Sequence, residues 1–88
     1  MKCIHLIVSG KVQGVFFRDS TRIKANELGL TGYVRNLSNG NVEVVAQGNE
    51  EKINELMEFI KNNPGHSKVD EVKIKTKELK NFSGFEIK

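Results

Sequence analysis

The sequence contains very little cysteine or proline and no tryptophan: its 88 residues include one Cys, one Pro and no Trp. Cys3 has no second cysteine to pair with, so folding does not depend on an oxidising compartment. No apolar run approaches the ~18 residues of a bilayer-spanning helix, and the N-terminus lacks the apolar core of a signal peptide. We therefore expect a cytoplasmic protein that does not associate with membranes.

A strong excess of charge of one sign is also absent. Lys and Arg total 14 and Asp and Glu total 11, which gives a formal net charge of +3. The lysines are spread along the chain among glutamates, whereas nucleic-acid-binding domains concentrate basic residues in patches. We expect no nucleic-acid partner, although the mild positive charge favours small anions. The length predicts a single domain over residues 1–88, and nothing indicates a large exposed apolar patch, so a monomer is expected.

Hydrophobic periodicity predicts the element order β-α-β-β-α-β with a short additional strand at the C-terminus. The predicted strands cover residues 2–9, 30–36, 42–47 and 67–76, with the short strand around Phe85 and Ile87. The predicted helices cover residues 18–28 and the stretch from the N-cap Asn49 to the stop at Asn62-Asn63-Pro64-Gly65. This order is typical of an α+β fold, the ferredoxin-like split βαβ sandwich, with two helices on one face of a mainly antiparallel sheet.

Two local features refine this prediction. Asn39-Gly40 predicts a type I′ hairpin turn, in which both residues have positive φ. The alternation of the fourth long strand is interrupted at Asp70-Glu71, which indicates an edge strand or a β-bulge.

The stretch from Ser9 to Arg18 has the composition of an anion-binding loop. Gly10 and Gly14 allow tight backbone conformations, and consecutive N–H groups before a helix can form a nest for an anion. Arg18 adds a permanently charged, planar group at the same place. The glycine spacing fits neither a Walker A loop nor a dinucleotide fingerprint. The alternative is a plain strand–helix connection, with Arg18 in solvent or paired with Asp19 or Glu27.

The predicted topology brings a second polar residue towards this loop. In a split βαβ unit the first two strands run in the same direction with the third strand between them. Their C-terminal ends therefore lie at the same edge of the sheet, about 10 Å apart. The second strand ends at Asn36, so Asn36 is expected near the loop, and Arg35 should point to the opposite face.

The remaining polar residues suggest no other chemistry. His5 is interpreted as a structural or surface residue because no metal-ligand spacing surrounds it. The sequence predicts no metal cluster, no cofactor site, no activated Cys or Ser, and no His–carboxylate pair.

Residues 10–18, Gly-Lys-Val-Gln-Gly-Val-Phe-Phe-Arg, closely resemble the Gly-x-Val-Gln-Gly-Val-x-Phe-Arg signature of the acylphosphatase family. Residues 29–36 resemble that family's second block, and Asn39-Gly40 and residues 84–87 continue the match, so the resemblance covers essentially the whole chain. Tyr33 stands where Trp is frequent, and Lys88 stands where many members end in an aromatic residue. The family has a ferredoxin-like fold, in agreement with the predicted order of elements.

The resemblance implies an enzyme that hydrolyses acyl phosphates, with inorganic phosphate as product and competitive inhibitor and with no metal or cofactor. Arg18 would bind the phosphoryl oxygens, and Asn36 would hold the attacking water. The phosphate cradle would be lined by the backbone N–H groups of Gln13, Gly14, Val15, Phe16 and Phe17.

The alternative is a ferredoxin-like module without catalysis that binds RNA, phosphate or carbamoyl phosphate. RNA-binding modules of this kind use paired aromatic residues on their strands, which are lacking here, since Tyr33 is the only aromatic residue in the first three predicted strands. Domains resembling acylphosphatases also occur inside larger carbamoyl-transfer proteins, and the length of 88 residues argues against that setting.

Overall fold

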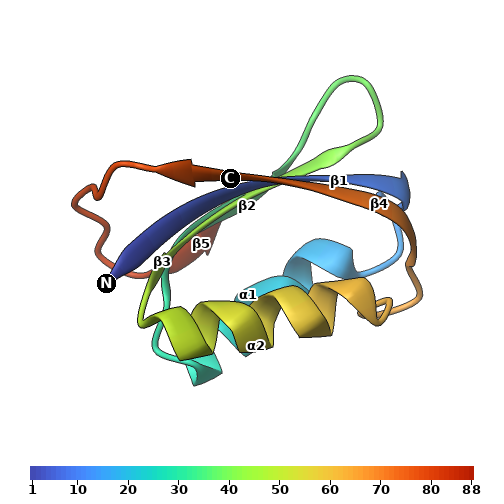
Figure 1. Cartoon of the computed structure of the whole chain (residues 1–88). Helices are drawn as coiled ribbons and strands as arrows, with labels where there is room; N and C mark the ends of the chain where they lie inside the picture. Colours follow the sequence, from blue (N-terminus) through green and yellow to red (C-terminus); the bar gives the residue numbers. More distant parts are fainter.

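Two helices pack on one face of a five-stranded sheet in the computed structural model, which describes residues 1–88 (Figure 1). The elements in chain order are β1 (Lys2–Lys11), α1 (Phe17–Glu27), β2 (Thr31–Asn36), β3 (Val42–Gly48), α2 (Glu50–Lys61), β4 (Lys68–Lys77) and β5 (Phe85–Ile87). The strands lie in the order β4-β1-β3-β2-β5, and only the β2–β5 pairing is parallel. This arrangement confirms the predicted ferredoxin-like α+β fold, with β3 inserted between β1 and β2.

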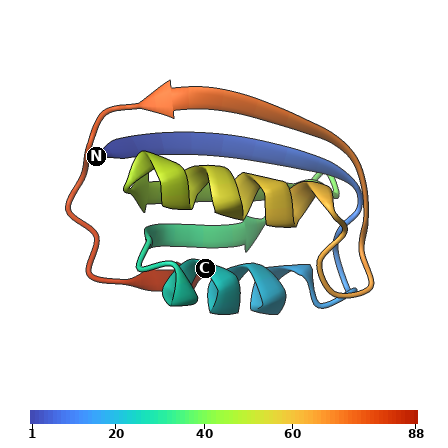
Figure 2. The same ribbon diagram turned by 60° about the horizontal axis from the view of Figure 1, so that its bottom comes forward.

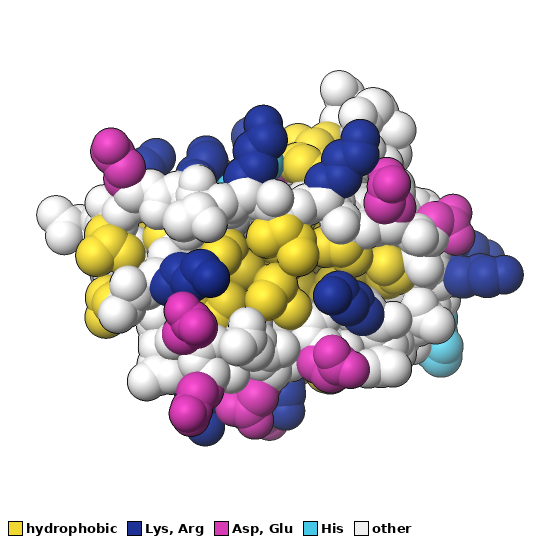
Figure 3. All heavy atoms as spheres, in the orientation of Figure 1, with side chains coloured by type: hydrophobic (Ala, Val, Ile, Leu, Met, Phe, Trp, Pro, Cys, Tyr) yellow, Lys and Arg dark blue, Asp and Glu magenta, His cyan; other side chains and the backbone are white.

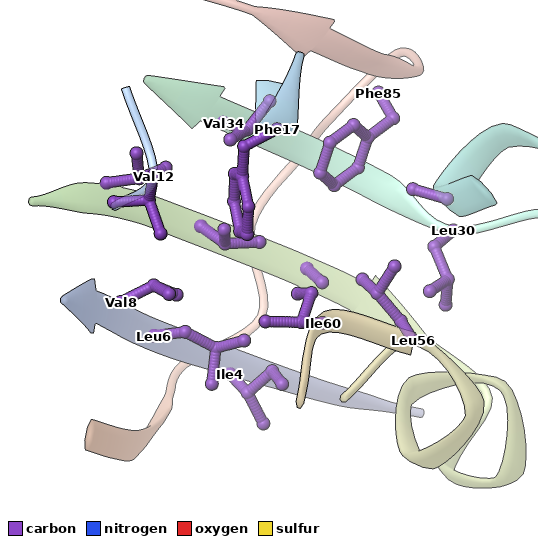
Figure 4. Close-up of a cluster of buried hydrophobic side chains, with 14 of the residues drawn as sticks. Ile4, Leu6, Val8, Val12, Phe17, Leu30, Val34, Leu56, Ile60 and Phe85 are labelled. Atoms are coloured by element: carbon purple, nitrogen blue, oxygen red, sulfur yellow. The ribbon is translucent and has the colours of Figure 1, made fainter. Parts of the chain in front are cut away.

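The core lies between the helices and the sheet. Ile4, Leu6 and Val8 alternate along β1 and point to the helices, as Figure 4 shows, and all three are buried. The helices contribute buried residues at helical spacing: Phe17, Thr21 and Ala25 from α1, and Ile53, Leu56 and Ile60 from α2. Figure 2 shows both helices side by side against this face, with β4 and β5 at the two edges of the sheet. Neither helix has the length and apolar character needed to cross a bilayer.

β4 is an edge strand with a bulge, as its broken alternation predicts. Ser9 pairs with Glu71 and Gly10 pairs with Val69, so Asp70 is the extra residue. The strand continues to Lys77, one residue beyond its predicted end.

Three lysines, spaced two apart in β4, lie on the face that the helices leave open. The register places Lys73, Lys75 and Lys77 opposite Ile7, His5 and Cys3. Because alternate residues of a strand share a face, β4 aligns these three lysines on one side of the sheet. Figure 3 shows Lys and Arg side chains along the top of the molecule, where this open face lies, and a mixture of both charges around the helices below.

The predicted type I′ turn at Asn39-Gly40 is wrong. Gly40 has φ 91°, but Asn39 does not have positive φ. The N–H of Gly40 donates to the carbonyl of Leu37 at 3.2 Å, and the N–H of Asn41 donates to the Asn39 side chain at 3.0 Å. The side chain of Asn39 therefore satisfies the backbone of a longer, five-residue connection, residues 37–41 between the paired residues Asn36 and Val42. A Gly in the left-handed region after an ordinary turn is the common pattern of such longer hairpin loops.

Candidate functional site

Residues 12–16 connect β1 to α1 and form what we call the cradle loop. The backbone N–H groups from Gln13 to Asp19 donate no hydrogen bond to any protein group, and no side chain caps α1. Gly14 has φ 72° and Phe16 has φ 64°, so left-handed residues alternate with others in the loop. Alternation of this kind turns successive N–H groups to one side as an anion-binding nest, and the N-terminus of α1 adds partial positive charge. A row of unsatisfied donors at a helix N-terminus is suited to a phosphate or carboxylate.

Tertiary contacts fix the cradle loop on both sides. The Gln13 side chain donates through Nε2 to the carbonyls of Leu37 and Asn41, both at 2.8 Å. On the other side, the N–H of His66 donates to the carbonyl of Val15 at 2.9 Å. Gly65 makes this approach possible, because a Cβ there would lie 2.6 Å from the same carbonyl oxygen. The loop is therefore tied to the β2–β3 connection and to the α2–β4 connection.

Arg18 is partly exposed and makes no ion pair with any residue of the chain. The two acidic residues that could have neutralised it are paired elsewhere: Asp19 with Arg22 at 3.4 Å, and Glu27 with Lys24 at 3.9 Å. The sequence left such a pairing open as an alternative, and the structure does not form it. The guanidinium of Arg18 is therefore available to an anion in the adjoining pocket.

A pocket of about 350 Å³ lies beside Arg18. Its walls are formed by the residues Val12, Gly14, Phe16, Phe17, Arg18, Asp19 and Ile87. Four of the predicted site residues thus line one pocket, namely Gly14, Phe16, Phe17 and Arg18. Gln13, Val15 and Asn36 do not line it; Val15 is buried, and the Gln13 side chain turns to the β2–β3 connection. Sequence reasoning noted the departure at Lys88 but missed Ile87, because spacing does not indicate which side chain of the C-terminal strand reaches the N-terminus of α1.

Asn36 ends β2 and pairs with Val42 in the sheet. Its amide oxygen Oδ1 is buried and accepts no hydrogen bond from the protein. Buried polar atoms usually have a partner, and one without a protein partner is suited to a water molecule or a ligand. Gln13 binds the carbonyl of Leu37, the residue after Asn36, so the cradle loop is joined to the end of the strand that carries Asn36.

The prediction that the chain has no His–carboxylate pair is wrong. Glu43 Oε2 lies 2.8 Å from His5 Nε2, and Glu43 Oε1 accepts a hydrogen bond from Arg35 Nε at 2.5 Å. Burial alone would raise the pKa of the Glu43 carboxyl, but the hydrogen bonds and charges of His5 and Arg35 outweigh it, and the pKa is lowered. The sequence could not reveal the pair because 38 residues separate its members.

This network lies apart from the cradle loop. The register places Arg35 opposite Glu43, and Glu43 opposite Ile7, on the open face of the sheet. Arg35 therefore points away from the helices, as expected from its position next to Asn36. No group of three or more His, Cys, Asp or Glu side chains is placed to hold a metal ion.

The chain is similar to known proteins over almost its full length. Residues 4–87 match the family model described as Acylphosphatase. A protein of Acaryochloris marina named Acylphosphatase is 45% identical over 85 residues, which cover 97% of this chain and 91% of that protein. The solved structure of an acylphosphatase from Coxiella burnetii is 47% identical, with a TM-score of 0.94, and the match covers 99% of this chain and 92% of that one. The crystal structure of acylphosphatase from Bacillus subtilis is 34% identical, with a TM-score of 0.95 and coverage of 99% and 98%.

Proposed function

Because the chain belongs to the acylphosphatase family, we propose that it hydrolyses acyl phosphates to a carboxylate and inorganic phosphate. The observation that carries this proposal is the row of unsatisfied N–H groups from Gln13 to Asp19 beside the unpaired guanidinium of Arg18. Fixed donors and a fixed positive charge are what a phosphoryl group needs when it transfers.

In the proposed mechanism, the phosphoryl oxygens bind to the N–H groups of the cradle loop and to Arg18. The N–H groups of Gln13 through Phe17 face the oxygens, and the guanidinium forms two parallel hydrogen bonds where its geometry allows. Gln13 Nε2 and the N–H of His66 hold the loop before substrate arrives. The donors therefore need little reorganisation during the reaction, which is the main requirement for electrostatic catalysis.

Asn36 orients the attacking water through its side-chain amide. The water oxygen bonds to phosphorus, the bond from phosphorus to the bridging oxygen breaks, and its electron pair leaves with the carboxylate. A neutral amide cannot take a proton at pH 7, so a proton of the water passes to a phosphate oxygen, and the products are a carboxylate and dihydrogen phosphate. A carboxylate is a good leaving group and needs no general acid, so positioning and charge stabilisation supply most of the rate.

We further propose that the enzyme acts as a monomer in the cytoplasm, as one domain over residues 1–88, without metal or cofactor. Inorganic phosphate has the same oxygens as the phosphoryl group, so it competes with substrate for the cradle loop.

The test is phosphate release from acetyl phosphate and from benzoyl phosphate, measured with and without EDTA. We expect release that survives the chelator and falls competitively as inorganic phosphate is added. If the purified protein releases no phosphate from either substrate but binds RNA in a salt-sensitive manner, the binding-module alternative is correct.

A further inference from the structure

We propose that the pocket beside Arg18 holds the acyl group of the substrate, and that Phe16 and Ile87 select apolar acyl groups, aromatic ones in particular. This inference rests on the proposed function and names the substrate class of the same site. The sequence motifs indicate only the phosphate end of the substrate. The folded chain adds a second region, assembled from the cradle loop and the C-terminal strand.

The size of the pocket is the first reason. At about 350 Å³ it has room for about a dozen water molecules of ~30 Å³ each. A phosphoryl group has four heavy atoms and leaves much of this space unfilled. The volume is at the lower end of the usual range for small-molecule sites, ~300–1,000 Å³. A substrate that fills it needs a sizeable group attached to the phosphate.

The second reason is the apolar surface in the pocket. Phe16 is 66% exposed and Ile87 is 36% exposed, whereas the other two apolar lining residues, Val12 and Phe17, are 1% exposed and belong to the core. Phe16 and Ile87 therefore provide the apolar side-chain surface that a ligand can cover. They come from opposite ends of the chain, before α1 and in β5, and they meet beside the free cation Arg18.

Phe16 is held in place although it is exposed. Its backbone has φ 64° and ψ 20°, a left-handed conformation that is unusual for a bulky aromatic residue and that recurs at binding sites. Its carbonyl accepts the N–H of Ser20 at 3.1 Å, and its ring packs edge-on against His66, with centroids 5.8 Å apart. A fixed ring loses little entropy when it contacts a second aromatic group.

The polar lining residues explain why polar acyl groups are disfavoured. No hydroxyl or amide side chain lines the pocket, so a polar acyl group would leave water without gaining a hydrogen-bonding side chain. Arg18 is occupied by the phosphoryl group in the proposed mechanism. The remaining charged residue, Asp19, carries a negative charge that repels an acyl group bearing a second carboxylate.

The test compares kcat/KM for benzoyl phosphate with kcat/KM for acetyl phosphate, which have the same phosphoryl group. The ratio of the two values is measured in the wild type, Phe16→Ala, Phe16→Tyr and Ile87→Ala. Any damage to the phosphate cradle affects both substrates and cancels in the ratio. Leu79→Ala is the matched control, because Leu79 is a large exposed apolar residue outside the pocket.

We expect the ratio to fall about twofold to tenfold in Phe16→Ala, the range of a lost aromatic pair. Ile87→Ala should lower it in the same direction, while Phe16→Tyr, which keeps the ring, and Leu79→Ala should retain the wild-type ratio. If both substrates are hydrolysed and neither Phe16→Ala nor Ile87→Ala changes the ratio, the acyl pocket is wrong and the proposed function stands. If the wild type hydrolyses neither substrate, the proposed function fails and this inference fails with it.

Discussion

Replacing Gln13 with alanine removes the two hydrogen bonds that join the cradle loop to the β2–β3 connection. Both bonds run from Nε2, to the carbonyls of Leu37 and Asn41, and both are 2.8 Å long. An intramolecular hydrogen bond contributes about 0.5–1.5 kcal/mol net, so Gln13→Ala should lower the free energy of unfolding by about 1–3 kcal/mol. For a chain of this size, each kcal/mol of lost unfolding free energy lowers Tm by about 4–8 °C.

The larger consequence should be catalytic. The loop would keep the bond from His66 to Val15 but lose its link to the end of β2, where Asn36 lies. The N–H groups proposed to bind phosphate and the Asn36 amide proposed to orient water would then no longer be held relative to one another. Because a misplacement of ~1 Å can cost ~10²-fold in rate, we expect kcat to fall about tenfold to a hundredfold. KM should change much less, since Arg18 and the N–H groups remain.

Gln47→Ala is the matched control for this experiment. Gln47 also makes two side-chain hydrogen bonds to backbone, both to Lys80 and both 2.8 Å long, but far along the sheet from the cradle loop. It should lose similar stability and keep its kcat. Thermal melts and steady-state kinetics on acetyl phosphate measure both quantities. Equal losses of Tm with wild-type kcat in both variants would refute a positioning role for Gln13.

Three further outcomes are expected. Arg18→Ala should lower kcat/KM by at least ~10²–10³ and weaken inhibition by phosphate, with Arg18→Lys intermediate, because an ammonium cannot form two parallel hydrogen bonds. Asn36→Ala should lower kcat and leave phosphate inhibition nearly intact. It should barely change Tm, because Oδ1 has no protein partner to lose. Wild-type turnover in both Arg18→Ala and Asn36→Ala would disprove the proposed catalytic site. Glu43→Gln tests the network on the open face by urea unfolding. The folded pKa of Glu43 is lowered, so its contribution to stability is present above the ordinary pKa of 4.5 and is lost as pH falls through the folded value. The wild-type advantage over Glu43→Gln should therefore shrink towards low pH, and an advantage independent of pH would contradict this account.

Local patterns were sufficient for most of the fold. The hydrophobic periodicity of residues 2–9 predicted the strand β1, and Asn49 was predicted as the N-cap of α2, where its side chain accepts the N–H of Glu51 at 2.8 Å. Both signals depend on residues a few positions apart. The hairpin between β2 and β3 was predicted correctly, but its type I′ turn was wrong although the turn is local. The Asn39 side chain could bind the backbone in a second way, and the sequence does not indicate which way is used.

The candidate site likewise has features that local sequence predicted and features that only folding produced. The sequence by itself determined the row of cradle donors, the glycine at position 14 and the presence of Arg18, because these residues are neighbours in the chain and their spacing carries the signature. Only the folded structure decided that Arg18 is unpaired, since Asp19 pairs with Arg22 and Glu27 pairs with Lys24, each three residues away in α1. It also decided that Gln13 binds the β2–β3 connection and that Ile87 borders the pocket. The contacts of Gln13 and Ile87 join residues far apart in the chain, and they exist only once packing of the sheet against the helices has fixed the distances between them.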